Sequence, residues 1–254
     1  MSLHVERTGS GAPLLLIHGW GMHGGIWSDI VPQLAPYFQA YCVDLPGHGA
    51  SAAMGVFTLD GVVDRLAAQF DQPVTVCGWS LGGQIALHWA AREPEIVKRL
   101  VLVTSTPCFA ERKDWPFGMP QDTLRQFAAE LEMDHAATLR RFLALQVRGS
   151  ERERELLATL REILFSRGEP DPDSLRGGLA ILREADLRDA LPGIMQPALV
   201  IAGERDRITP PEASQYLAER LPNARLALIR GAAHAPFLSH APEFVEYLIR
   251  FLNE

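Results

Sequence analysis

Cysteine is scarce in this chain, with three among 254 residues, at positions 42, 77 and 108. An odd number of scattered thiols suits neither a disulfide framework nor a metal-ligand spacing, and it indicates a reducing compartment. Apolar runs near the roughly 18 residues of a membrane span are also missing, and the first ten residues lack the apolar core of a secretory signal. We therefore expect a cytoplasmic protein with no membrane association and no metal. We also expect a monomer.

Positive charge is in deficit. The chain has 24 basic and 31 acidic residues, a formal net charge of −7, which disfavours non-specific binding to nucleic acid. The P-loop pattern G-x-x-x-x-G-K-[ST] and the zinc motif H-E-x-x-H do not occur, and the glycine-rich turn at 44–51 is not a dinucleotide fingerprint. We expect no cofactor.

What the chain does contain is a series of short apolar runs, each ended by a glycine or a polar turn. Runs of four to six residues with little alternation predict strands buried on both faces of a parallel sheet. The predicted strands are Pro13–Ile17, Ala40–Val43, Val74–Gly78, Leu100–Thr104, Ala198–Ala202 and Arg225–Ile229. Helical patterns separate them, at Gly25–Tyr37, Leu59–Phe70, Ser80–Arg92, Pro211–Leu221 and Ala241–Leu252. This alternation predicts an α/β fold with a mostly parallel central sheet flanked by helices.

One interval breaks the alternation, because more than ninety residues separate Thr104 from Ala198. A structureless loop of that length would be implausible in a compact domain. Helical patterns fill the interval, at Gln121–Glu132, His135–Gln146, Glu151–Phe165 and Asp173–Glu184. We predict that residues 108–189 form an inserted helical lid, and that residues 1–107 and 190–254 form the core.

The sharpest local motif is Gly78-Trp79-Ser80-Leu81-Gly82, between a predicted strand and a predicted helix. A sharp strand-to-helix turn needs small residues on both sides of its apex, and it places a serine hydroxyl at a helix N-terminus, which favours a developing anion. Such a serine could also be a simple helix cap. The strand-turn-helix context favours Ser80 as a nucleophile.

A serine nucleophile needs a base and an orienting carboxylate, which in this kind of sheet follow in the order Ser, Asp, His. Asp206 and Glu204 lie in the loop after one late strand, and His234 lies after the next. We predict Asp206 as the orienter, with Glu204 as the fallback, and His234 as the base. His18 and His48 could line the same site.

The tetrahedral intermediate of acyl transfer also needs hydrogen-bond donors for its oxyanion. One is expected from the backbone N–H of Leu81, the residue after the nucleophile, and the other from the loop after the first predicted strand. In that loop, glycines flank Trp20 on both sides. We predict the backbone amides of Trp20 and Leu81 as the oxyanion hole.

With these motifs, the chain resembles the α/β-hydrolase family over nearly its whole length. The matching segments are HGWG at 18–21, DLPGHGAS at 44–51, GWSLGG at 78–83, GERD at 203–206 and GAAHAPF at 231–237. The resemblance implies the α/β-hydrolase fold and a serine hydrolase with a Ser-Asp-His triad. A serine at position 80 excludes the branches of the family that use an aspartate nucleophile.

Segments that lie mostly in the predicted lid are similar to the pimeloyl-[acyl-carrier protein] methyl ester esterases of biotin synthesis. These segments include Ser105–Phe109, Arg141–Gln146 and Gly177–Leu182. The resemblance implies a carboxylesterase that hydrolyses the methyl ester of a pimeloyl chain carried by acyl carrier protein. It also implies substrate contacts at Trp20, Ser80, Leu81, Phe142, Leu143, Ala144, Leu145, Gln146 and His234.

A long acyl chain needs an apolar passage between lid and core. Side chains that could line it are those of Trp79, Phe109, Trp115, Phe142, Leu143 and Leu145, although they could equally pack the lid against the core. An acidic carrier protein needs a basic surface, and residues 140–161 contain six arginines against three glutamates, a local net of +3. Arg141 and Arg154 match family positions, and we predict that they bind the partner.

Other functions remain open at this level. The triad does not separate this substrate from those of a general short-chain carboxylesterase or of a carbon–carbon bond hydrolase. A ligand receptor that kept the pocket and lost turnover is a non-enzymatic alternative, which an intact triad argues against.

Overall fold

The computed structural model describes residues 2–254, and a seven-stranded sheet forms its centre. The strands are β1 (Val5–Thr8), β2 (Ala12–Ile17), β3 (Phe38–Val43), β4 (Val74–Trp79), β5 (Val97–Val103), β6 (Ala198–Gly203) and β7 (Ala224–Ile229). Their order is β1-β3-β2-β4-β5-β6-β7, and only β1 runs antiparallel to its neighbour. The carboxyl ends of the six parallel strands therefore share one edge.

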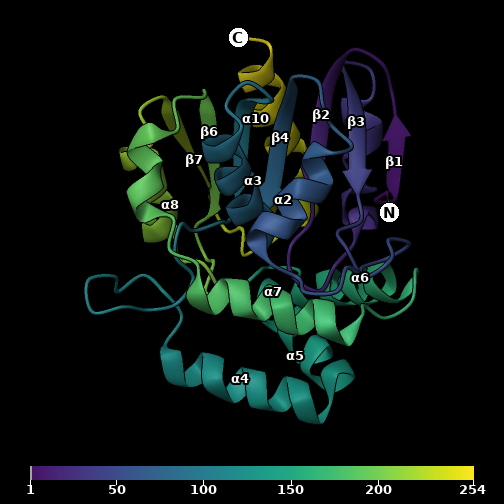
Figure 1. The fold of residues 1–254 in the computed structure, drawn as a ribbon, viewed down its shortest axis with the longest axis vertical. Coiled ribbons are helices and arrows are strands. Elements are labelled where there is room, and N and C mark those ends of the chain that lie inside the picture. Colours follow the sequence, from purple (N-terminus) through teal and green to yellow (C-terminus); the bar gives the residue numbers. More distant parts are fainter. Residues whose placement is uncertain (1) are drawn as a thin grey trace.

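Helices cover both faces of the sheet (Figure 1). Helices α2 (Leu59–Ala67), α3 (Leu81–Arg92) and α8 (Pro211–Arg220) lie on one face, while α1 (Val31–Leu34) and α10 (Ala241–Leu252) lie on the other. The 3-10 helices η1 (Gly24–Trp27) and η2 (Arg188–Gly193) and the short α9 (Pro236–Ser239) complete the core. The central strands are apolar along their length because both faces are covered: Leu14, Leu15, Leu16 and Ile17 are all fully buried.

The predicted sheet and most predicted helices are confirmed within a few residues. The strand β1 was missed because its side chains are mostly exposed and carry no apolar run. The single helix predicted at Gly25–Tyr37 is wrong, since the chain forms η1 there and then a separate short α1. Pro32, which lies in the first turn of α1, is the residue that should have indicated a new helix start.

Four helices lie between β5 and β6 in sequence: α4 (Gln121–Met133), α5 (His135–Val147), α6 (Glu153–Phe165) and α7 (Pro172–Glu184). In Figure 1 they lie below the carboxyl edge of the sheet, with α6 and α7 next to it and α4 farthest away. This layer therefore faces the edge from which the loops bearing Ser80, Asp206 and His234 emerge.

The layer is tied to the sheet on the side of α6. The guanidinium of Arg167, just after α6, lies 3.1 Å from both carboxylate oxygens of the fully buried Asp44, which follows β3. His23 Nε2 lies 2.7 Å from the carbonyl oxygen of Ile163 in α6. Breaking a buried ion pair by removing one partner typically costs about 3–5 kcal/mol, so these contacts fasten one side of the layer firmly.

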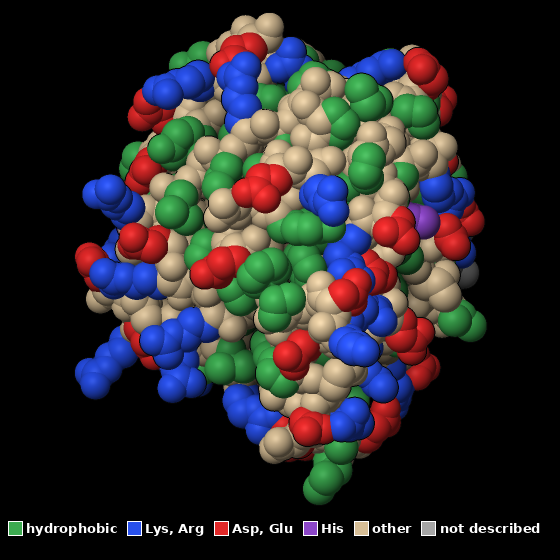
Figure 2. All heavy atoms as spheres, turned by 90° about the vertical axis from the view of Figure 1, so that its left-hand side faces the viewer, with side chains coloured by type: hydrophobic (Ala, Val, Ile, Leu, Met, Phe, Trp, Pro, Cys, Tyr) green, Lys and Arg blue, Asp and Glu red, His purple; other side chains and the backbone are tan. Residues whose placement is uncertain are grey.

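On the face shown in Figure 2, basic and acidic side chains are interspersed and do not form large areas of one sign. Across residues 2–254, no helix combines the length and apolar character that crossing a bilayer requires.

Candidate active site

Ser80 lies at the sharp turn between β4 and α3. Its backbone has φ 55° and ψ −116°, a region that residues with side chains rarely adopt. Two glycines permit the turn, because a Cβ at Gly78 would lie 2.2 Å from the carbonyl oxygen of Gly82, and a Cβ at Gly82 would lie 2.5 Å from that of Ile17. The Ser105 hydroxyl donates to the Ser80 carbonyl at 2.8 Å and braces the turn from the end of β5.

Asp206 and His234 form a buried pair after β6 and β7. His234 Nδ1 lies 2.8 Å from Asp206 Oδ2, and both side chains are almost fully buried. Because an ionised carboxylate can only accept, Nδ1 carries the proton and the lone pair of the neutral ring lies on Nε2. Among the described residues 2–254, that Nε2 is buried and meets no hydrogen-bond partner. An imidazole held in this tautomer can accept a proton at Nε2.

Contacts next to Ser80 join this pair to the serine turn. The indole Nε1 of Trp79 donates to the His234 carbonyl oxygen at 2.8 Å, and the two rings lie 5.6 Å apart. Glu204, the fallback orienter, is exposed and instead accepts from the backbone N–H of Gly231 at 3.0 Å. The structure therefore brings Asp206 rather than Glu204 to the histidine.

The loop after β2 lies directly against the serine. A Cβ at Gly19 would lie 3.1 Å from the Trp79 ring and 3.3 Å from the Cβ of Ser80, so a larger residue here would press on the serine turn. Trp20 follows in the same loop, and its indole Nε1 donates to the Leu175 carbonyl oxygen of α7 at 2.9 Å. Leu81 is the first residue of α3, whose initial N–H groups have no acceptor within the helix. Both predicted oxyanion donors thus belong to segments that meet at Ser80.

His18 and His48 are buried in structural roles. His18 accepts from the Leu45 N–H at Nε2 and lies 2.8 Å from the Gly19 carbonyl oxygen at Nδ1. Burial, together with the neighbouring His48, lowers the pKa of His18 to about 3, and burial lowers that of His48 to about 4. Both rings are therefore neutral near pH 7, and they support the loops around the site.

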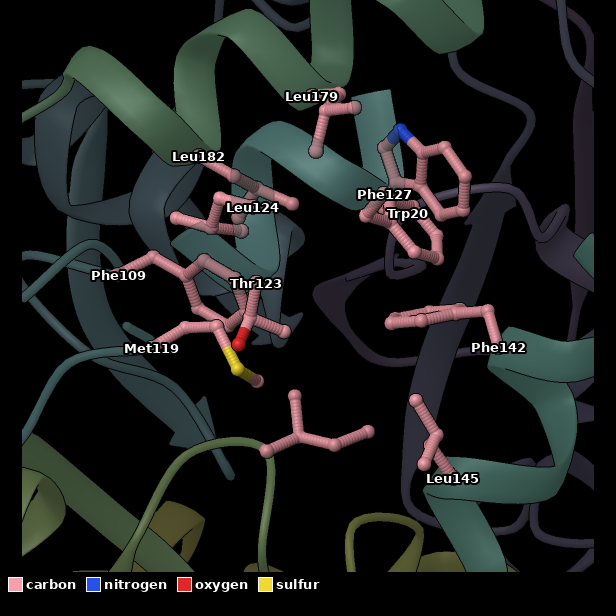
Figure 3. A pocket seen from close by; sticks show the side chains of 11 residues that line it. Trp20, Phe109, Met119, Thr123, Leu124, Phe127, Phe142, Leu145, Leu179 and Leu182 are labelled. Atoms are coloured by element: carbon pink, nitrogen blue, oxygen red, sulfur yellow. The ribbon is translucent and has the colours of Figure 1, made fainter. Parts of the chain in front are cut away.

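An apolar pocket lies between the helical layer and the sheet edge (Figure 3). Only Thr123 and Trp20 among its lining residues carry a polar side-chain atom, and the Trp20 Nε1 donates to the Leu175 carbonyl oxygen. The pocket is lined by Trp20, Phe109, Met119, Thr123, Leu124, Phe127, Phe142, Leu145, Leu179, Leu182 and Ile208. Trp20 packs edge-on against Phe127 and Phe142, so its ring forms part of the wall, while the preceding residue, Gly19, lies against Ser80. The pocket suits an uncharged methylene chain.

The predicted lining residues divide into two groups. Phe109, Phe142 and Leu145 line the pocket. The other three predicted lining residues, Trp79, Leu143 and Trp115, do not; the first two are buried in the main core, and Trp115 packs against Tyr216 in a separate cluster.

The remaining predicted substrate contacts lie on α5. Ala144 is half-buried there, and the backbone carbonyl of Gln146 accepts from the His234 N–H at 3.1 Å. Gln146 Oε1 is buried and meets no partner among residues 2–254. The end of α5 therefore contacts the same loop as the predicted base.

The predicted basic surface is exposed on α5 and α6, but part of its charge is paired. Arg141 forms an ion pair with Glu130 of α4, a residue outside the segment counted from the sequence. Arg152 pairs with Glu155, and Arg154 is exposed on α6. Within residues 2–254, no cluster of three or more histidine, cysteine or acidic side chains is placed to hold a metal ion.

Comparison with known proteins decides the family, because a model described as the alpha/beta hydrolase fold matches residues 12–241. The chain belongs to the α/β-hydrolase family. Its relatives include proteins named pimeloyl-[acyl-carrier protein] methyl ester esterase. The one from Nitrosomonas europaea is 46% identical, over 96% of this chain and 97% of the relative. The one from Chromobacterium violaceum is also 46% identical, over 100% of this chain and 99% of the relative.

Solved structures agree with this fold. An esterase from Exiguobacterium antarcticum has a TM-score of 0.91 at 25% identity, over 99% of this chain and 96% of that one. A bromoperoxidase from Bacillus anthracis has a TM-score of 0.90 at 26% identity, over 99% and 95% of the two chains. The resemblance and the fold expected from the sequence are confirmed.

Proposed function

We propose that this α/β hydrolase is a serine carboxylesterase that hydrolyses the methyl ester of pimeloyl-[acyl-carrier protein], giving the free ω-carboxylate and methanol for biotin synthesis. The observation that carries the proposal is the buried Asp206–His234 pair, whose histidine is bonded through its carbonyl oxygen to Trp79, the neighbour of the strained Ser80. The proposal is also supported by relatives that are 46% identical over nearly their full length and are named for this activity.

In the proposed reaction, Ser80 Oγ attacks the ester carbonyl while His234 Nε2 takes its proton. Asp206 holds the imidazole tautomer and stabilises the imidazolium, and the Trp20 and Leu81 amides hold the oxyanion. His234 then gives the proton to the departing methoxide. A water molecule activated by the same histidine hydrolyses the acyl-enzyme and releases the acid.

The pocket explains the choice of a long acyl chain. Each buried methylene contributes about 0.8 kcal/mol, so a chain of several methylenes against Trp20, Phe142 and Leu145 gains substantial binding free energy.

We further propose the context in which this enzyme works. Residues 108–189 act as a lid over a core of residues 1–107 and 190–254, and Arg141 and Arg154 on the lid bind acyl carrier protein. The enzyme acts as a monomer in the cytoplasm. Three buried free cysteines among the described residues support a reducing compartment.

A general short-chain carboxylesterase is the second candidate, favoured by the similarity to the esterase from Exiguobacterium antarcticum. Comparing kcat/KM for the carrier-bound pimeloyl methyl ester with that for a short p-nitrophenyl ester separates the two. We expect a strong preference for the carrier-bound substrate, and a preference for the short ester would favour the second candidate.

The decisive variant is Ser80→Ala. Because triad members act as a unit, we expect kcat to fall about 10⁶-fold for both substrates. The matched control is Ser239→Ala, a half-buried serine on α9 whose hydroxyl donates to the Ala235 carbonyl oxygen. Near-normal turnover by Ser80→Ala would overturn the assignment.

A further inference from the structure

Two buried threonines outside the proposed triad connect its acid to its base. The Thr209 hydroxyl lies 2.7 Å from Asp206 Oδ2, 3.3 Å from His234 Nδ1 and 2.9 Å from the Thr104 carbonyl oxygen. The Thr104 hydroxyl donates to the His234 carbonyl oxygen at 2.7 Å. Since Thr104 directly follows β5, the pair links the ends of β5, β6 and β7.

Thr104 has an unusual backbone conformation. Its φ is +40°, and a β-branched residue in the left-handed region is strained. Strained residues persist only where their surroundings hold them, and they gather at functional sites. The Thr104 N–H donates to the Ile201 carbonyl oxygen of β6 at 2.7 Å. In this conformation the hydroxyl of Thr104 reaches the backbone of His234, and its carbonyl oxygen reaches the Thr209 hydroxyl.

The hydrogen bonds of Asp206 show what Thr209 adds. Oδ1 accepts from the backbone N–H groups of Ile208 at 2.8 Å and Thr209 at 3.1 Å. Oδ2 accepts from His234 Nδ1 and from the Thr209 hydroxyl. Without that hydroxyl, Oδ2 would be held only by the imidazole that it is meant to orient. The Asp206 carboxylate acts by holding the His234 imidazole in place. The hydrogen bonds that hold the carboxylate itself should therefore affect kcat.

We propose that Thr104 and Thr209 are positioning residues of the hydrolase reaction. Thr209 donates its single hydroxyl proton to the carboxylate oxygen that faces His234 Nδ1, and the Thr104 carbonyl oxygen, which lies farther away, is a second acceptor of that proton. The Thr104 hydroxyl fixes the main chain of His234. This inference rests on the proposed function. Neither threonine lines the acyl pocket, so their effect belongs to the chemical step and not to substrate binding.

The test is Thr209→Val, which keeps the shape of the side chain and removes the hydroxyl. With a short p-nitrophenyl ester we expect kcat to fall about tenfold, as for the loss of one hydrogen bond to a charged group, with KM unchanged. Thr209→Ser should return kcat to within about threefold of the wild type. Thr104→Val should also lower kcat, and the double variant should lose less than the product of the two single effects.

Thr106→Val is the matched control, because Thr106 is buried on the same segment and its hydroxyl donates to the Cys108 carbonyl oxygen at 2.8 Å. Active-site titration with a fluorophosphonate counts the folded enzyme in every sample. Unchanged kcat in Thr209→Val, an equal loss in Thr209→Ser, or a change confined to KM would each overturn the inference. Failure of the proposed function is separate, since it would appear as activity retained by Ser80→Ala.

Discussion

The residues of the serine turn were the part of the site that could best be predicted from the sequence. Gly78, Ser80 and Gly82 were recognisable because a turn this tight tolerates few residue types. Thr104 and Thr209 were missed, since threonine is common after strands and no short motif marks one whose partners lie far along the chain. A short motif predicts residues that a local turn requires. Hydrogen bonds between residues far apart in the sequence become visible only in the folded structure.

At this scale we predict the effect of Gly82→Ala. The added Cβ would lie 2.5 Å and 2.7 Å from the carbonyl oxygens of Ile17 and His18, which are backbone atoms with little freedom to move. The free energy of unfolding should fall by about 1–3 kcal/mol, and esterase activity should fall with it.

Urea unfolding measures this change. The control is Gly193→Ala, where an added Cβ meets nothing within 4 Å and stability should stay within about 0.5 kcal/mol of the wild type. Equal stability of the two variants would show that the close packing at Gly82 is not a constraint.

Whole elements were predictable where their pattern was strong. The buried parallel strands and α10, whose predicted and observed bounds agree at Ala241–Leu252, follow from apolar periodicity. β1 was not predictable in this way, because its place comes from antiparallel pairing with β3 and not from its own residues. The charge of the α5–α6 surface was overestimated for a related reason, since Glu130 reaches Arg141 from another helix.

For these two helices we predict the effect of Arg141→Glu combined with Arg154→Glu. If the surface binds an acidic carrier protein, KM for the carrier-bound ester should rise about tenfold at low salt, and the effect should shrink as salt screens the charges. Steady-state kinetics with carrier-bound and free small esters measure this. Arg250→Glu on α10 is the control, and equal changes in KM for both substrates would argue against docking.

The molecule as a whole has a core with buried histidines that are neutral when folded. Burial lowers the pKa of His18 to about 3 and that of His48 to about 4, while both would titrate near 6.5 in the unfolded chain. At a pH between the folded and the unfolded pKa of each histidine, the unfolded chain binds a proton on that ring and the folded protein does not. Stability is therefore fully present above about pH 7 and is lost as the pH falls from 6.5 towards 4.

We predict that the free energy of unfolding, measured in urea at pH 7.5, 6.0 and 5.0, falls with each step. His48→Gln should reduce this pH dependence, because glutamine can still donate to the Pro46 carbonyl oxygen but does not titrate. The same substitution at the partly exposed His4 should leave the dependence as it is in the wild type. A flat stability profile in the wild type would contradict the expectation.

The contacts of Arg167 and His23 lie along one border of the helical layer, while α4 lies on its outer side, away from the sheet. The layer is also bonded to the core through α5 and α7, because the Gln146 carbonyl oxygen accepts from the His234 N–H and the Leu175 carbonyl oxygen accepts from the Trp20 indole. If the proposed acyl chain enters beneath this layer, we therefore expect α4 to move more than α5, α6 and α7, each of which is hydrogen-bonded to the core.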